Sequence, residues 1–304
     1  MNRRDFLSVG MFAAASMPLP PLDSTRSSTQ LGSFDFIFLT DTHIQPELAA
    51  AEGCAMCFKK AQLLHADFAI QGGDHVFDAS AVARKRAESL YDLYARTEQS
   101  LGLKVHHVLG NHDIFGLSPN SGIYLGEQGQ EKQMYEERIG PTYYSFDHRG
   151  YHFVVLDSIQ LTNDRNWEAA VDGAQKAWLA KDLAALSPVT PVIVATHVPL
   201  VTGAASYVTP RPNDKQIFVT NAYDMLPLFR GHRLLGVLQG HLHLNEVVRF
   251  NDVPFITSGA VCGNWWHGTR LGTPEGFTVV SLRDGKISWR YETDGFQSID
   301  PKNT

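Results

Sequence analysis

The chain has 304 residues, 43% hydrophobic and 19% charged, a balance typical of a soluble globular protein with one large α/β domain or two smaller ones. Its formal charge of -6 gives no basic footprint of the kind that nucleic-acid-binding proteins carry, so we expect no nucleic-acid partner. An acidic balance does not exclude phosphate substrates, because bound metal ions can dominate the local field.

The first segment of the chain is typical of an export signal. Arg3 and Arg4 precede Phe6, Leu7 and a mildly apolar, alanine-rich stretch, and this pattern resembles a twin-arginine signal. The stretch, roughly ten residues long, is too short to span a bilayer as an ordinary helix. We expect residues 1–30 to be signal and linker, the twin-arginine machinery to be a partner, and the protein to be periplasmic or membrane-tethered. A basic N-terminus without a targeting role is the alternative.

Strand-like and helix-like segments then follow one another along the chain. Short apolar segments predict strands at 34–39, 66–70, 104–109, 192–195 and 234–238. Apolar spacing near 3.6 predicts helices at 47–65, 79–101 and 174–186. Alternating segments predict strands at 143–147, 152–156, 247–250, 255–258, 277–282 and 287–291, with a hairpin turn at Asp284-Gly285. The segments 114–140 and 199–220, the latter with Tyr207, Arg211 and Asn213, are typical of surface excursions.

These elements predict one domain over residues 31–304, with two sheets flanked by helices. Three cysteines argue against a complete disulfide framework. Cys54 and Cys57 are compatible with a redox pair, with half a zinc site, or with small buried residues one helical turn apart. The absence of a second cysteine pair favours burial, and Cys262 is expected to be a core residue.

Five of the predicted strands are each followed by a cluster of metal-ligating residues. The clusters are Asp41-Thr42-His43, Gly73-Asp74, Gly110-Asn111-His112-Asp113, His197, and Gly240-His241-Leu242-His243. Ligands of α/β sheets bind beyond the carboxyl ends of the strands, where these clusters lie. Carboxylates and imidazoles that converge in a buried place need a large positive charge, which two divalent cations would supply.

Residue spacing assigns the ligands to two ions. Alternation along an extended segment would place Asp41 and His43 on one face, and the same holds for His241 and His243. A carboxylate has two oxygens, so Asp74 is the natural bridge. Ion one then takes Asp41, His43, Asp74 and His243, and ion two takes Asp74, Asn111, His197 and His241. Mixed nitrogen and oxygen ligation suits Mn, Fe, Zn or Co, whereas the imidazoles argue against Ca or Mg.

This ligand set indicates phosphoester hydrolysis. Two neighbouring metals can hold a bridging water as hydroxide and neutralise a phosphoryl group during in-line attack. His112, beside Asn111, is placed to protonate the leaving oxygen, and we expect Asp113 to hold its other ring nitrogen.

With the five clusters in this order, the chain from about Phe34 to Arg290 resembles the calcineurin-like metallophosphoesterase superfamily. The resemblance implies an α/β/β/α sandwich of two mixed sheets flanked by helices, with the ligand roles given above. Purple acid phosphatases of this group carry a Tyr where this chain has Phe77, so a phenolate-bound ferric ion is not expected. Protein Ser/Thr phosphatases have Asp-Arg-Gly where this chain has Asp78-Ala79-Ser80, and Glu in place of Asp113. The chain is therefore more similar to small bacterial phosphodiesterases.

Three further residues are candidates for substrate contact. Trp265 and Trp266 lie in a glycine-rich loop after a predicted strand, where they could wall the pocket and stack on a base, sugar or aryl group. The alternative is that both rings cap the core. His75 follows the bridging Asp74 and could support the site from behind it, with a position at the surface as the alternative. We expect an exported two-metal phosphodiesterase, with a phosphomonoesterase or a catalytically silent metal-binding scaffold as alternatives.

Overall fold

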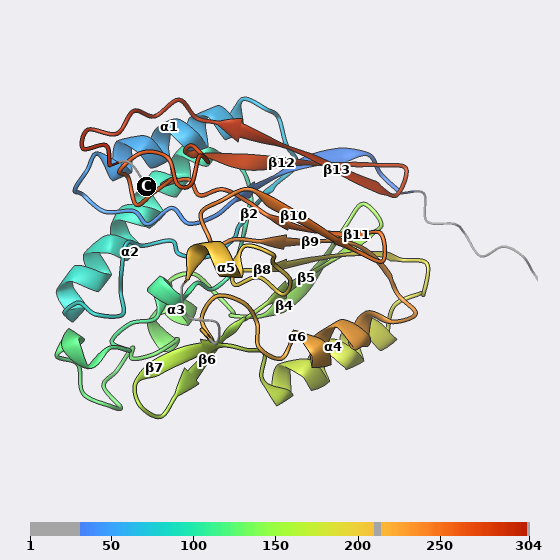
Figure 1. Ribbon diagram of the computed structural model, residues 1–304, viewed down its shortest axis with the longest axis horizontal. Helices are drawn as coiled ribbons and strands as arrows, with labels where there is room; N and C mark the ends of the chain where they lie inside the picture. Colours follow the sequence, from blue (N-terminus) through green and yellow to red (C-terminus); the bar gives the residue numbers. More distant parts are fainter. Residues whose placement is uncertain (1–30, 210–213, 303–304) are drawn as a thin grey trace, which may run out of the picture. The chain divides into compact units, whose positions relative to one another are not determined.

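Two mixed sheets lie face to face in the computed structural model (Figure 1), which describes residues 31–209 and 214–302. The expected signal and linker, together with Arg211 and Asn213, lie outside the described residues. The first sheet has the strand order β13-β12-β1-β2-β3. Its strands are β1 Phe34–Leu39, β2 Ala69–Gln71, β3 Val105–His107, β12 Gly276–Arg283 and β13 Lys286–Thr293. β1, β2 and β3 are parallel, so their carboxyl ends lie together.

The second sheet has the strand order β10-β11-β9-β8-β5-β4. Its strands are β4 Tyr144–His148, β5 Tyr151–Leu156, β8 Pro191–Thr196, β9 Arg233–Gln239, β10 Glu246–Phe250 and β11 Val253–Thr257. β5, β8, β9 and β11 are parallel, while β4 and β10 pair antiparallel at the two edges. Every strand of this sheet was predicted within a few residues of its observed bounds.

Helices cover the outer face of each sheet (Figure 1). The helices of the described chain are α1 Ala50–Gln62, α2 Arg84–Glu98, α3 Gln133–Arg138, α4 Gly173–Ala184, α5 Ala205–Val208 and α6 Ala222–Met225. Short 3₁₀ helices lie at Gln99–Leu101, Asn111–Asp113, Pro119–Ser121 and Leu226–Phe229. α1 and α2 pack on the first sheet, and α4 and α6 pack on the second.

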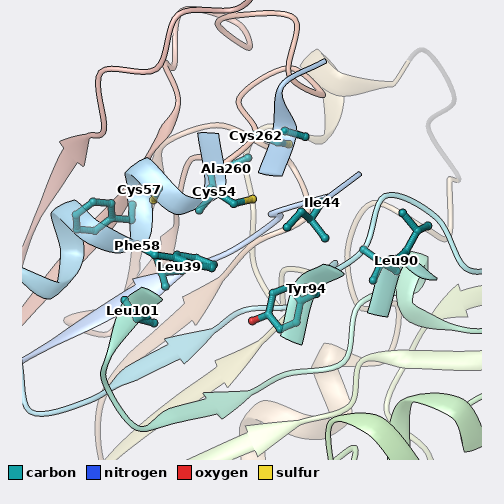
Figure 2. Close-up of a cluster of buried hydrophobic side chains, with 14 of the residues drawn as sticks. Leu39, Ile44, Cys54, Cys57, Phe58, Leu90, Tyr94, Leu101, Ala260 and Cys262 are labelled. Atoms are coloured by element: carbon teal, nitrogen blue, oxygen red, sulfur yellow. The ribbon is translucent and has the colours of Figure 1, made fainter. Parts of the chain in front are cut away.

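Strand β1 shows how alternation builds the layers. Ile37 and Leu39 point to the core beneath α1 and α2, which Figure 2 shows with Phe58 and Leu101. Phe36 and Phe38 point to the core between the sheets, where aromatic rings from both sheets meet. Successive residues of a strand face opposite sides, so one six-residue strand joins two apolar layers. The predicted four-layer α/β/β/α sandwich is confirmed.

The sequence predicts neither the hairpin of β6 Ile159–Thr162 and β7 Asn166–Ala169 nor the short helices α3, α5 and α6. The hairpin is separate from the two large sheets. By contrast, the predicted turn between β12 and β13 is confirmed. Arg283 pairs with Lys286, and Asp284 and Gly285 adopt positive φ values of 51° and 69°, as a two-residue hairpin requires.

The cysteines are packing residues. Cys54 and Cys57 lie on the buried face of α1, and Cys262 faces the same core (Figure 2). All three are free, and burial raises the pKa of each thiol, which disfavours the reactive thiolate. Among the described residues, no helix is both long and apolar enough to cross a bilayer.

The aromatic core between the sheets should carry much of the stability. Phe153 is 1% exposed, stacks on Phe146 with ring centroids 4.8 Å apart, and meets Phe36 and Phe68 edge to face. Phe153→Ala should therefore lower the free energy of unfolding by about 3–5 kcal/mol. Phe250→Ala is the control, since Phe250 is 57% exposed on an edge strand. Denaturant titration that finds equal losses for the two variants would contradict the assigned core.

Candidate metal centre

The seven expected metal ligands lie together beyond the carboxyl ends of β1, β2, β3, β8 and β9. Backbone hydrogen bonds join the loops that carry them. Asp41 N–H donates to Gly73 O at 3.0 Å, and Gly240 N–H donates to His197 O at 2.9 Å. The loops of five strands thus form one connected platform from both sheets.

Asp74 occupies the middle of the cluster. Its Oδ2 lies 3.4 Å from His43 Nε2 and 3.2 Å from His197 Nε2. Its Oδ1 accepts the backbone N–H of His112 at 2.8 Å, which fixes the plane of the carboxylate. Asp74 therefore stands between the two expected ligand groups, as a bridging residue must.

The other ligands complete the two ends of the cluster. On one side, His243 Nε2 lies 3.2 Å from Asp41 Oδ1 and 3.2 Å from His43 Nε2. On the other side, Asn111 Oδ1 lies 3.2 Å from His197 Nε2. Ligand atoms of Asp41, His43 and Asp74 all lie within 4.8 Å of one another, and so do those of Asp74, His197 and His241. Both groups contain Asp74. A third group within the same limit joins His43 and His243 to the Cys262 thiol.

Each ligand imidazole has one ring nitrogen against a backbone carbonyl. The pairs are His43 Nδ1 with Phe77 O at 3.3 Å, His197 Nδ1 with Gly72 O at 2.8 Å, His243 Nδ1 with Gly263 O at 2.7 Å, and His241 Nε2 with Gln216 O at 2.8 Å. A carbonyl only accepts, so that nitrogen carries a proton, and in the neutral ring the other nitrogen keeps the lone pair that a metal ion needs. Such pairing is the usual way in which a protein sets the tautomer of a metal-binding histidine.

The charge state of the buried carboxylates favours the binding of positive ions. Burial opposes ionisation of Asp41 and Asp74, but the nearby imidazoles outweigh it and hold the pKa of both carboxyls well below the ordinary range. Burial also opposes protonation of His197, yet the charge of Asp74 raises the pKa of that imidazole to about 9. Asp41 Oδ1 is buried and has no hydrogen-bond partner within the described chain. An oxygen of this kind is accounted for by a cation that it would ligate.

The backbone at the site is not extended, contrary to our expectation. Five ligands adopt the left-handed region with φ between 38° and 70°: Asp41, His43, Asp74, His241 and His243. This conformation is unfavourable for side chains other than Gly and recurs at functional sites. The side chains still converge because each loop turns sharply at the strand end. A Cβ on Gly110 would lie 2.1 Å from the Asp74 nitrogen, so that position needs glycine.

His112 lies beside the cluster and is accessible. Its side chain is 26% exposed, and its ring centroid lies 4.9 Å from that of His43. The nearest carboxylate is Asp78, whose Oδ1 lies 3.8 Å from His112 Nδ1. The expectation that Asp113 holds this ring nitrogen is therefore wrong.

Asp113 instead fastens two ligand loops together. Its carboxylate is fully buried and accepts the backbone N–H groups of Gly110, Asp74 and His75 at 2.9, 3.0 and 2.8 Å. His75 Nδ1 lies 2.8 Å from the same carboxylate, and His75 Nε2 lies 3.1 Å from His107 Nδ1. Because His75 is 0% exposed, it cannot contact substrate and supports the site from behind.

The adjacent tryptophans have different places. The Trp265 ring is partly exposed and lies 4.0 Å from His43 and 5.0 Å from His112, centroid to centroid. Trp266 is 0% exposed, packs on Phe296, and donates its indole N–H to His43 O at 3.0 Å. The expectation that both rings wall the pocket thus fails for Trp266. Two consecutive residues with positive φ send their side chains to opposite sides of the loop.

Gln216 was not identified from the sequence. Its carbonyl orients His241, and its side-chain amide donates to Trp167 O at 2.9 Å. A backbone carbonyl leaves no signal in residue type, and the hairpin that it contacts was not predicted. Of the excursion residues named above, Tyr207 is 83% exposed, on α5.

The family model described as calcineurin-like phosphoesterase matches residues 34–245. Purple acid phosphatase 23 of Arabidopsis thaliana is 30% identical over 173 residues, which make up 55% of this chain and 34% of that protein. The chain thus spans about a third of the length of this relative.

Three solved structures are similar in fold. A dimetal phosphatase from Danio rerio gives a TM-score of 0.60 at 17% identity, covering 86% of this chain and 96% of that one. Purple acid phosphatase PPD1 from yellow lupin gives 0.58 at 14% identity, covering 90% and 53%. GAP50 of Plasmodium, described as the anchor in the inner membrane complex, gives 0.54 at 18% identity, covering 89% and 90%.

Metal binding should stabilise the fold, because the ligands are gathered only in the folded chain. Adding Mn²⁺ or Zn²⁺ to chelator-treated protein at about a hundred times its Kd should stabilise it by about 2.7 kcal/mol, seen as a rise in Tm. Asp41→Asn should remove most of this rise, because a ligand charge is lost. Glu52→Gln, at an exposed position on α1, should keep it. An equal rise in both variants would show that the cation binds elsewhere.

Proposed function

Because the chain belongs to the calcineurin-like phosphoesterase family, we propose that it is a two-metal hydrolase that acts on small phosphodiesters. One observation carries the proposal: a partly exposed imidazole, His112, lies beside two groups of ligand atoms that share Asp74. These groups support the expected assignment of ligands to two ions. Asp41, His43, Asp74 and His243 would hold one, and Asp74, Asn111, His197 and His241 the other.

The donor chemistry supports Mn, Fe, Zn or Co as the bound metals. Four imidazoles disfavour Ca and Mg, which prefer oxygen ligands. When bound, two such cations supply Lewis acidity toward phosphoryl oxygens and activate water. Phe77 offers no phenolate, and its ring instead meets Trp265 at 5.7 Å between centroids. A purple ferric centre is therefore not part of the proposal.

The chain's own residues account for proton transfer and positioning. During hydrolysis the bond from phosphorus to the leaving oxygen breaks, a bond to the water oxygen forms, and His112 donates a proton to the leaving oxygen. Proton donation of this kind contributes on the order of 10²–10⁴ in rate. Asp113 holds the Asp74 and Gly110 loops in register beneath the reacting atoms. Trp265 offers an indole face to the leaving group beside His112.

A phosphomonoesterase is the second candidate. It is favoured by the 30% identity to a protein named as a purple acid phosphatase. The two can be separated by offering protein reconstituted with Mn, Fe, Co or Zn both bis(4-nitrophenyl) phosphate and 4-nitrophenyl phosphate. The proposal expects the higher kcat/KM on the diester, and the reverse preference would establish the monoesterase. Lack of turnover with all four metals would favour a catalytically silent scaffold.

We also propose that the chain is exported by the twin-arginine route. The pattern at Arg3, Arg4, Phe6 and Leu7 supports this, and an export path for folded proteins suits an enzyme loaded with metal before export. Fractionation of cells that express Arg3→Lys/Arg4→Lys protein should find it retained in the cytoplasm. Unchanged export of this variant would contradict the route.

His112→Ala should lower kcat strongly while the protein keeps two metal ions, because the imidazole is assigned to proton transfer and not to ligation. The expected loss is at the low end of the range for acid catalysis, on the order of 10²-fold, with a nitrophenyl diester, because its good leaving group needs the acid least. His65→Asn serves as control, because His65 is exposed and its positive φ of 54° suits Asn. Elemental analysis that finds lost metal in His112→Ala would contradict the assigned role.

A further inference from the structure

Trp167 on β7 contacts the metal centre at the end away from Trp265. Its ring centroid lies 5.8 Å from that of His241, with the planes at 84°, so that the rings meet edge to face. The indole is partly exposed and belongs to the hairpin that neither large sheet includes. None of the roles derived above uses this ring.

The position of Trp167 is fixed relative to the ligands. Gln216 accepts a hydrogen bond from His241 Nε2 at its backbone carbonyl and donates one to Trp167 O from its side chain. The hairpin is also joined to the same segment by Ala169 N–H, which donates to Lys215 O at 2.7 Å. The backbone that carries the indole is thus held in place before any ligand binds, and such preorganisation reduces the entropy lost on binding.

The indoles of Trp265 and Trp167 therefore contact different residues of the ligand cluster. Trp265 meets His43, His243 and the proton donor His112. Trp167 meets His241, whose neighbours in the cluster are His197 and Asp74. The two tryptophans have no ligand imidazole in common.

A phosphodiester matches this arrangement, because it has an organic group on either side of phosphorus. The group that leaves takes its proton from His112 and so lies on the side of Trp265. The attacking oxygen approaches opposite the leaving group, so the group that phosphorus keeps extends sideways from that axis, and Trp167 lies at a side of the cluster that Trp265 does not contact. A monoester has no second organic group, so none of its atoms would contact Trp167.

We propose that Trp167 binds the organic group that phosphorus retains, and that the preferred substrates are diesters whose retained group is planar or aromatic. This inference rests on the proposed function. An indole face stacks on bases and aryl rings regardless of their hydrogen-bonding pattern, so it selects a flat group and not one particular base.

Three esters with the same leaving group isolate the retained side. Bis(4-nitrophenyl) phosphate retains an aryl group, methyl 4-nitrophenyl phosphate retains a methyl group, and 4-nitrophenyl phosphate retains none. Trp167→Ala should lower the ratio of kcat/KM between the first ester and the second roughly ten-fold, the size expected for loss of one stacking contact. Trp167→Phe should restore most of the ratio, and Trp167→Leu, which keeps apolar volume without a ring, should not.

Two readouts separate substrate binding from structural support. In the His112→Ala background, calorimetry should find bis(4-nitrophenyl) phosphate bound roughly ten-fold more weakly when Trp167 is replaced by Leu, with metal content unchanged. Trp265→Ala is the matched comparison, because it should affect both diesters alike through their common leaving group.

The outcomes distinguish the two proposals. An unchanged ester ratio in both Trp167→Ala and Trp167→Leu, or a ratio that falls only together with metal content, overturns the role of Trp167. If the unaltered protein prefers the monoester, the role of Trp167 is also overturned, but the protein is still a phosphoesterase. Lack of turnover of all three esters overturns the proposed function and this inference with it.

Discussion

The arrangement of the site depends on negative charge that is buried in the fold. Asp41 is 0% exposed and Asp74 1% exposed, and both carboxyls remain ionised because imidazoles surround them. A buried carboxylate is tolerated only with compensating positive charge. The neighbouring imidazoles supply part of that charge, and Asp41 Oδ1 makes no hydrogen bond to the described residues although His243 Nε2 lies 3.2 Å away. Two cations would complete the balance with ligands already gathered.

The fold holds this charge in place by fixing the loops around it. Ligands at left-handed backbone positions are conformationally costly, and they persist only where the surroundings determine them. Asp113 supplies part of that restraint by accepting N–H groups from two ligand loops, and His75 backs its carboxylate in turn. The parallel strands bring the loops together, and the apolar layers on both sides keep the strands rigid.

Sequence patterns predicted the layers and the side chains that gather beyond the strand ends, because both follow from regular geometry. Alternation in β1 assigns its residues to two cores, and parallel strands place their carboxyl-terminal residues at one end of the sheet. The patterns failed where a loop decides the direction of a side chain. Trp265 and Trp266 are neighbours of the same type, yet one meets the ligands and the other is buried, because positive φ values at both redirect the chain. The partner of Asp113 and the carbonyl of Gln216 depend on tertiary contacts that leave no local signature.

The central claim is that two cations share the carboxylate of Asp74. Crystals of the full chain grown with Mn²⁺, with diffraction recorded at the manganese absorption edge, test it most directly. The account predicts two anomalous peaks roughly 3.5–4 Å apart on either side of that carboxylate, the spacing typical of two-metal hydrolases. A single peak at saturating Mn²⁺, or peaks that leave Asp41 Oδ1 without a metal contact, would contradict it.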